Sequence, residues 1–546
     1  MHRSKLAKRA WLLFFVGAFA VYFYGLGRYP FIGPDEPRYA EVAREMLMRG
    51  DLVTPTLGGR AWFEKPVLLY WVEMAAFGVF GVSEWAARLG TALAGLLTAL
   101  VVYLLGKRVE QASAAEKERG LGLASGVTLA TSVGLIGFSR GVNFDILLTL
   151  TLTVALACFF LSELNVDQRR RGWLLAGFYA AVGASLLAKG LVGIVLPAGV
   201  IFAYFMLRRA WPDRTLILSA LWGIPLALIV AAVWYAPVIA RHGWPFVDQF
   251  FIQHHFARFV TNKYHHPHVF YYYLPIIAML AVPWTVFLLA SLGAAPRWDW
   301  RAQTTEAKYR VFALAWLAVP VIFFSFSNSK LPGYVLPALP GAALLVGERL
   351  SRFLRGEGGP TAMRATGALL LLLGVGELIY VLRAGYISTN CALIIALPLS
   401  TAGALVLLWT RLRRLSLVFT VCALLIAVIL TIECASAPVA SRESVRDLLR
   451  LADTRGYSAA PVFHLYEVDH TTHYYAAGRL AYGPDGQPLK YEGTFQIRDA
   501  ARRHGGGPIL VFVHSDYTWQ LTQYDQIETE LIGDNGTVAL LAVRAR

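Results

Sequence analysis

Three acids and one arginine stand within seven residues of the stretch GPDEPRYAE (33–41), which follows directly after the first apolar run. Apolar residues then recur with a helical period from Tyr39 to Leu47, so the stretch predicts a short helix. In isolation, Asp35 is more often the cap of such a helix than a reactive group, and its charged neighbours are more often solvated. The other charged stretches decide between these interpretations.

Two further stretches place charge at the edge of apolar runs. FEKP (63–66) is typical of a lysine that extends to the lipid headgroups, with Glu64 as its surface partner. SRGVNFD (139–145) ends one apolar run and opens the next, and there Arg140 and Asp145 are either helix ends or a functional pair, because charges at membrane depth are costly. Lys189 in LLAKG allows the same two interpretations, a lysine that extends to the headgroups or a ligand for an anion.

Histidines and a Pro-Gly turn mark two later stretches. HHFARFVTNKYHHPH (254–268) holds five histidines beside Arg258, but their spacing fits none of the standard zinc signatures. SNSKLPGYVLP (327–337) places Lys330 and Tyr334 around a turn at the mouth of an apolar run. An ammonium and a phenol in that position suit a phosphate.

The composition identifies a polytopic helical membrane protein. The chain has 546 residues, 57% hydrophobic and 16% charged, with a mean hydropathy of +0.52. Most of its net charge of +15 stands in short clusters between apolar runs, which indicates membrane topology and no nucleic-acid partner. The four cysteines show neither metal-type nor disulfide-type spacing.

Apolar runs long enough to cross about 30 Å of hydrocarbon predict about 13 transmembrane helices within residues 1–435. The short run 67–82 carries Glu73. Counting it as a span would place the basic loops outside, so we assign it to the outer interface. All the stretches described above then fall on the outer face, in loops that include a first periplasmic loop, 28–84. Residues 436–546 alternate β-branched runs with turns, which predicts a small α/β periplasmic domain.

The conjunction of these stretches points to one kind of site. Acid-rich stretches and several cations share one face of the membrane, which suggests a cavity for a phosphate-bearing lipid with a reaction near it. The cations and phenol concerned are Lys65, Arg140, Arg258, Lys330 and Tyr334.

The motifs GPDEPRYAE, FEKP, RGVNFD, LAKG, HHFARF and SKLPGYVLPALP, in this order, resemble the lipid A 4-amino-4-deoxy-L-arabinose transferase family. These are polyprenyl-phosphate-dependent glycosyltransferases of the GT-C fold, related to protein O-mannosyltransferases. The resemblance extends over essentially the whole chain. It implies that undecaprenyl phosphate carries the aminopentose, that a lipid A phosphate accepts it, and that transfer inverts the anomeric centre on the periplasmic side of the bacterial inner membrane.

The resemblance also implies roles for single residues. Asp35 matches the principal catalytic acid and Asp145 the second acid, while Arg38 and Tyr39 would shape the same cavity. The positions expected near the carrier phosphate are Lys65, Arg258 and Tyr334. Glu64 and His255 match a pair that can hold a divalent ion such as zinc. Trp62 stands where a tyrosine is expected, so the hydrogen bond of that tyrosine is not expected here.

The resemblance implies that the modified lipid A is cationic and confers resistance to polymyxin and other cationic peptides. We expect the enzyme to act as a monomer. Two alternatives stay open from the sequence. One is a GT-C transferase of another lipid-linked sugar, such as galacturonic acid, mannose or galactosamine, to lipopolysaccharide core or to protein. The other is a flippase for lipid-linked sugars, since many spans with charges also describe transporters.

Overall fold

The computed structural model describes residues 16–546 except 114–119, 258–267, 386, 484–485 and 506, and of residues 255–257 it describes only the backbone. The chain forms two compact units, each built from more than one segment. The first unit consists of Met1–Tyr24, Phe63–Leu69 and Arg88–Leu430. The second consists of Gly25–Trp62, Tyr70–Ala87 and Thr431–Arg546.

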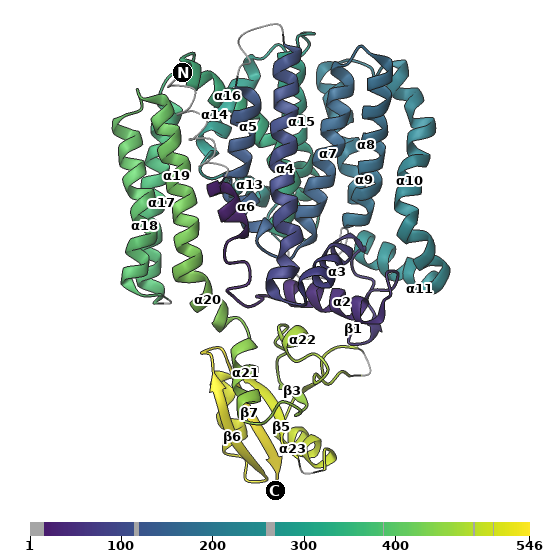
Figure 1. The fold of residues 1–546 in the computed structure, drawn as a ribbon, viewed down its shortest axis with the longest axis vertical. Helices are drawn as coiled ribbons and strands as arrows, with labels where there is room; N and C mark the ends of the chain where they lie inside the picture. Colours follow the sequence, from purple (N-terminus) through teal and green to yellow (C-terminus); the bar gives the residue numbers. More distant parts are fainter. Residues whose placement is uncertain (1–15, 114–119, 258–267, 386, 484–485, 506) are drawn as a thin grey trace. The chain divides into compact units, whose positions relative to one another are not determined.

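Long apolar helices dominate the first unit (Figure 1). Within the described residues, eight helices are long and apolar enough to cross a membrane, or nine if one bent pair counts as a span. The eight are α4 (Glu84–Ala112), α7 (Phe144–Leu164), α8 (Gln168–Lys189), α10 (Arg214–His242), α15 (Thr305–Ser325), α17 (Thr361–Ala384), α18 (Thr389–Leu408) and the segment Arg413–Arg442, which includes α19 (Arg413–Thr431) and α20 (Ala437–Arg442). The prediction of a polytopic helical membrane protein is confirmed.

Several predicted spans are shorter or interrupted. The bent pair consists of α5 (Leu121–Ala130) and α6 (Val133–Ser139), which meet at 54°. The span expected from Val269 is divided between α13 (Tyr273–Leu280) and α14 (Thr285–Ala294). Other short helices in the described part of this unit include α9 (Val192–Arg208), α11 (Trp244–Val247) and α16 (Leu339–Arg355). The count of 13 stays a prediction.

Glycines let neighbouring helices approach closely in the first unit. A Cβ added to Gly106 of α4 would lie 2.7 Å from the Cα of Gly122 in α5. A Cβ on Gly403 of α18 would lie 2.6 Å from the backbone nitrogen of Leu371 in α17. Small residues serve this purpose in membrane helices, where close packing replaces the hydrophobic driving force.

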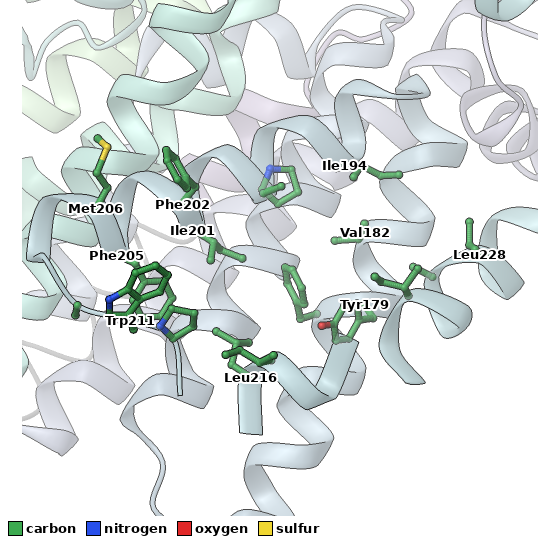
Figure 2. A pocket seen from close by; sticks show the side chains of 18 of the residues that line it. Tyr179, Val182, Ile194, Ile201, Phe202, Phe205, Met206, Trp211, Leu216 and Leu228 are labelled. Atoms are coloured by element: carbon green, nitrogen blue, oxygen red, sulfur yellow. The ribbon is translucent and has the colours of Figure 1, made fainter. Parts of the chain in front are cut away.

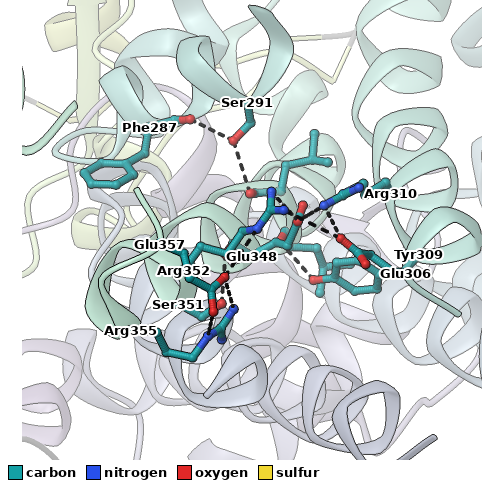
Figure 3. Close-up of polar contacts among 12 residues, drawn as sticks. Phe287, Ser291, Glu306, Tyr309, Arg310, Glu348, Ser351, Arg352, Arg355 and Glu357 are labelled. Atoms are coloured by element: carbon teal, nitrogen blue, oxygen red, sulfur yellow. Dashed lines mark hydrogen bonds and ion pairs between the residues drawn. The ribbon is translucent and has the colours of Figure 1, made fainter. Parts of the chain in front are cut away.

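A polar network joins α15 to α16 (Figure 3). The Arg310 guanidinium donates to Glu348 through Nε at 3.0 Å and through Nη2 at 2.5 Å, and it also pairs with Glu306. Arg352 lies 3.4 Å from the same Glu348 carboxylate, which is buried. A buried charge must be paired in this way, because an unpaired one would carry its full desolvation cost.

The second unit contains a five-stranded sheet with the order β4-β3-β5-β7-β6. Its strands are β3 (Val462–Leu465), β4 (Lys490–Tyr491), β5 (Ile509–His514), β6 (Ile527–Asp534) and β7 (Val538–Ala545). The strands β4, β3 and β5 run parallel, and β7 and β6 are antiparallel additions. The helices α21 (Arg446–Thr454), α22 (Thr472–Tyr475), α23 (Thr494–Arg503) and α24 (Trp519–Thr522) connect them.

Alternating residues of β5 divide the core of this sheet into two layers. Leu510 and Phe512 pack with α21, while Ile509, Val511 and Val513 pack with α23. This alternation is the period of two that a strand imposes on its side chains. The small α/β fold expected for residues 436–546 is therefore present, without a disulfide.

Segments of the first predicted loop belong to this second unit as well. They form α2 (Asp35–Arg49), the short strands β1 (Thr56–Leu57) and β2 (Arg60–Ala61), and most of α3 (Leu68–Phe80). α3 has 13 residues, about 20 Å of helix, and is too short for about 30 Å of hydrocarbon. α2 packs against α22, and the Arg44 guanidinium lies 4.7 Å from the centroid of the Tyr474 ring.

Candidate functional site

In the first unit, Asp145 stands in the first turn of α7. Asn143 caps this helix, because its side-chain oxygen accepts a hydrogen bond of 3.0 Å from the backbone nitrogen of Ile146. The Asp145 side chain is 16% exposed and pairs with the ammonium of Lys189, the last residue of α8. From the sequence, Lys189 was a possible ligand for an anion. In the structure its ammonium forms an ion pair with the Asp145 carboxylate.

The turn SKLPGYV lies against the same pair. The Lys189 nitrogen stands 4.5 Å from the centroid of the Tyr334 ring, in the 3₁₀ turn η5 (Pro332–Ala338). A Cβ on the neighbouring Gly333 would lie 2.5 Å from Oδ2 of Asp145. Only glycine therefore lets this turn approach the carboxylate, and Asp145, Lys189 and Tyr334 form one cluster.

Two other predicted cations have partners in the backbone. Arg140 is buried and donates hydrogen bonds to the carbonyls of Val21 at 2.6 Å and Tyr24 at 2.8 Å. Lys330 is also buried and donates to the carbonyl of Ser327 at 2.5 Å, and burial lowers the pKa of its ammonium. In this structure both side chains hold the chain in place.

FEKP is anchored by its aromatic residue. The Phe63 ring packs edge-to-face on Phe246 of α11 at a centroid distance of 5.1 Å. The next two residues, Glu64 and Lys65, pair with each other at 3.2 Å, and both side chains are largely buried. Lys65 is thus placed on a fixed turn of the first unit.

The described residues do not form a metal centre around Glu64. Its carboxylate is paired with an ammonium, and the part of the chain that the structure describes contains no group of three His, Cys, Asp or Glu side chains arranged for a metal ion. The side chain of His255 and all of Arg258 lie outside the described residues. The pair of Glu64 and His255 stays a prediction from the resemblance, and no step below depends on it.

In the second unit, Asp35 begins α2. Its carboxylate accepts a hydrogen bond of 2.8 Å from Nη2 of Arg38, whose Nε donates to the carbonyl of Pro34 at 2.7 Å. The guanidinium also lies over the Trp62 ring at 5.8 Å. The tryptophan therefore stacks on Arg38, and its own Nε1 has no hydrogen-bond partner among the described residues. Half of the Asp35 side chain is exposed, so it can meet a substrate.

Two buried acids, Glu36 of α2 and Glu73 of α3, also belong to this unit. Glu36 is buried and accepts from the backbone nitrogen of Ile32 at 3.2 Å. Neither carboxyl oxygen of Glu73 in α3 has a hydrogen-bond partner within the described residues. Burial, and then the charge of Glu36, raise the pKa of Glu73 well above its ordinary value. The sequence used Glu73 only for topology, although it is the single acid in an otherwise apolar run.

Tyr39 completes this region without exposing its ring. The residue is 4% exposed, and its ring contacts that of Tyr70 edge-to-face at 6.4 Å. The side chains able to contact a substrate here are thus Asp35 and Arg38. A carboxylate and a guanidinium can bind an ammonium and a phosphate, while the carboxylate can also stabilise a positively charged transition state.

Comparison with known proteins gives the family context of these sites. The family model described as dolichyl-phosphate-mannose-protein mannosyltransferase matches residues 10–295. Two curated relatives are undecaprenyl phosphate-alpha-4-amino-4-deoxy-L-arabinose arabinosyl transferases. The one from Erwinia tasmaniensis is 34% identical over 57% of this chain and 54% of its own length. The one from Pseudomonas aeruginosa strain UCBPP-PA14 is 33% identical over 68% and 66%, so the chain matches about half to two thirds of these relatives.

The fold has close counterparts among solved structures. A crystal structure of ArnT from Cupriavidus metallidurans bound to undecaprenyl phosphate aligns with a TM-score of 0.78 and 23% identity, over 98% of each chain. The same protein in its apo state aligns with a TM-score of 0.77 and 22% identity, again over 98% of each chain. These alignments cover both units, so the GT-C fold expected from the sequence is confirmed.

Proposed function

The chain belongs to the dolichyl-phosphate-mannose-protein mannosyltransferase family, and from this premise we propose that it transfers 4-amino-4-deoxy-L-arabinose from undecaprenyl phosphate to the phosphate groups of lipid A. The names of the curated relatives support this donor and this sugar. The observation that carries the proposal is the cluster of Asp145, Lys189 and Tyr334, which sets a charge-compensated acid beside a phenol at the ends of apolar helices.

We also propose the bacterial inner membrane as its location, with the reaction on the periplasmic side. The basic stretch QRRR (168–171) opens α8, and Arg208 and Arg209 stand at the end of α9. Asp145 begins α7 and Lys189 ends α8, so both acid and lysine stand at the helix ends opposite these basic stretches. Positive residues favour the cytoplasm, which assigns the reaction to the other face.

The acceptor determines what the acids must do. A phosphate monoester has a second pKa of about 6 and is largely dianionic at neutral pH, so it needs no strong base. An acceptor phosphate oxygen forms a bond to the anomeric carbon on the face opposite the leaving group. The bond between that carbon and the carrier oxygen breaks, and undecaprenyl phosphate leaves with the electron pair.

Asp35 and Asp145 can each bind the sugar, for example through its ammonium, and each can stabilise oxocarbenium charge as the bond breaks. Lys65, Arg258 and Tyr334 neutralise the departing phosphate. Arg38 orients Asp35 through the 2.8 Å hydrogen bond. In this mechanism Lys189 compensates the Asp145 charge until the cationic sugar arrives.

The deciding experiment is mass spectrometry of lipid A from cells that lack their own transferase but make the donor. Cells that express this protein should gain the mass of one aminopentose per modified phosphate. Asp35→Asn should abolish the gain, and Asp516→Asn, a change in a carboxylate that is 82% exposed, should retain it. The proposal fails if the intact protein leaves lipid A unchanged, or if folded Asp35→Asn is fully active.

Two other readouts separate the alternatives. Release of free undecaprenyl phosphate by the purified protein would exclude a pure flippase. A different added mass, or a mass found on core sugars or on protein, would assign another sugar or acceptor to the same fold.

A further inference from the structure

An apolar cavity of about 890 Å³ lies between α8, α9 and α10 of the first unit (Figure 2). Its walls are aliphatic and aromatic side chains, among them Val182, Ile201 and Phe205. The hydroxyl of Tyr179, which also lines it, is hydrogen-bonded to Ser219 Oγ at 3.1 Å, so this ring adds little polarity. The cavity therefore suits a hydrocarbon chain.

The dimensions of the cavity fit one long chain. Its lining extends along α9 from Ile194 to Met206, and twelve residues of helix rise about 18 Å. This length is more than half of the bilayer hydrocarbon of about 30 Å. An extended acyl chain that enters at one end can therefore occupy most of the cavity.

Charge is confined to one end of the cavity. Arg209 is the single charged residue in its lining, and it follows the last residue of α9 with a positive φ of 50°. Its guanidinium has no hydrogen-bond or ion-pair partner among the described residues. Trp211, two residues later, is 92% exposed, as is typical of residues at the headgroup level.

The neighbouring charges are already engaged. Arg208 donates to the carbonyl of Ala302 at 3.2 Å and to the side chain of Gln303 at 3.0 Å. Asp213 accepts from Arg171 at 2.7 Å. Neither of these neighbours therefore neutralises Arg209, which remains available to an anion.

We propose that this cavity holds one acyl chain of an anionic phospholipid, whose phosphate binds Arg209. Basic pockets between membrane helices on the cytoplasmic side bind anionic headgroups, and a guanidinium fits a phosphate by two parallel hydrogen bonds. The lipid belongs to the leaflet on the side of the basic loops, which is the cytoplasmic leaflet in the proposed orientation.

The position of Arg209 distinguishes this lipid from the sugar donor. The proposed donor phosphate lies near Tyr334, which contacts Lys189 at the opposite end of α8 from the stretch QRRR and thus on the face away from Arg209. No cation lines the cavity at its Ile194 end. A lipid anchored by its phosphate inside this cavity must therefore enter from the Arg209 end.

The test is native mass spectrometry of the full-length protein purified in a mild detergent and then given phosphatidylglycerol or phosphatidylethanolamine. The intact protein should retain one phosphatidylglycerol in preference to phosphatidylethanolamine. Arg209→Gln should reduce this retention at least fivefold, and Ala198→Trp, which fills the cavity, should abolish it. Arg214→Gln is the matched control, because Arg214 is exposed and does not line the cavity.

Sugar transfer measured on the same samples keeps the two proposals separate. Arg209→Gln should transfer sugar at the rate of the intact protein and elute as a monodisperse species, which shows that it is folded. Equal retention by Arg209→Gln and the intact protein would overturn the proposal, as would equal retention of the two phospholipids. If undecaprenyl phosphate is the retained lipid and Ala198→Trp abolishes transfer, the cavity belongs to the donor instead.

Discussion

The Lys189 nitrogen lies 4.5 Å from the centroid of the Tyr334 ring, and the same ammonium pairs with the Asp145 carboxylate. One cation thus connects the last turn of α8, the first turn of α7 and the turn η5. Both charged side chains are largely buried, at 13% and 16% exposure. Removing either charge leaves the other without its partner.

We expect Lys189→Met to lower the free energy of unfolding by roughly 2–3 kcal/mol, because it strands a largely buried carboxylate. The rate of sugar transfer should fall at least tenfold. Thermal unfolding in detergent and a transfer assay measure the two effects. The double variant Asp145→Asn/Lys189→Met should regain part of the stability, although not the activity. A single variant that unfolds and transfers like the intact protein would contradict the pairing.

Gly333→Ala tests the close approach of the turn to the acid. The added Cβ would stand 2.5 Å from Oδ2 of Asp145 and 2.8 Å from the Phe138 ring, so the carboxylate must move. We expect turnover to fall at least tenfold, which corresponds to about 1.4 kcal/mol of transition-state stabilisation. Gly293→Ala is the control, because its Cβ meets nothing within 4 Å. Equal rates for the two variants would show that the turn has room to adjust.

Arg310→Met tests the polar network of α15 and α16. Among the residues that the structure describes, the buried Glu348 would keep only Arg352 as a cation, at 3.4 Å, so we expect a loss of about 2 kcal/mol in unfolding free energy. The comparison is Arg455→Met, which breaks an exposed pair with Glu530 and should cost less than about 1 kcal/mol. Denaturation midpoints of the two full-length variants measure the difference. A larger loss in Arg455→Met would refute this ranking.

Two buried histidines make the second unit sensitive to acid. Burial, followed by the positive potential of His470, lowers the pKa of His464 to about 3. Burial, His470 and Arg38 lower the pKa of His473 to about 3. Unfolding restores pKa values near 6.5, so the unfolded chain binds more protons between these values. The stability they contribute is complete above pH 6.5 and is lost as the pH falls toward 3, at about 1.4 kcal/mol per pH unit and histidine.

Protease resistance of the C-terminal segment at pH 7.5 and pH 5 measures this loss, with an acid-tolerant protease and an unfolded standard at each pH. We expect the intact protein to be cleaved faster at pH 5 after correction for the standard. The variant His473→Phe, which cannot take up the proton, should show a smaller difference between the two pH values. A larger difference in the variant would contradict the assignment.

The sequence was sufficient to predict a polytopic helical membrane protein with a small α/β domain, because hydropathy and alternation report burial directly. It did not predict where single spans bend or divide, as at α5 and α6. Asp145, Lys189 and Tyr334 were recognisable as candidates, since each interrupts or borders an apolar run. Their mutual contacts were not recognisable, because the topology inferred from the basic loops assigns residues to one face of the membrane and gives no distances between them.

Arg140 and Lys330 show the limit most clearly. Both donate to backbone carbonyls, at Val21 and Ser327. Every residue has a backbone carbonyl, so the sequence does not indicate which one accepts the hydrogen bond. The grouping of α2 and α3 with the C-terminal unit was equally hidden. It depends on contacts such as the hydrogen bond from Arg44 to the carbonyl of Tyr474, which are 430 residues apart.

The edge strand β6 affects whether copies of the protein associate when they are crowded in a membrane. The strand contains three acidic residues, Glu528, Glu530 and Asp534. Its pairing with β7 shifts register between Leu531 and Gly533. Charges and a bulge prevent an open edge from templating a further strand. Many copies can therefore be held at high density in a membrane without their sheets joining at β6, so overexpression should not by itself drive fibrous aggregation through this edge.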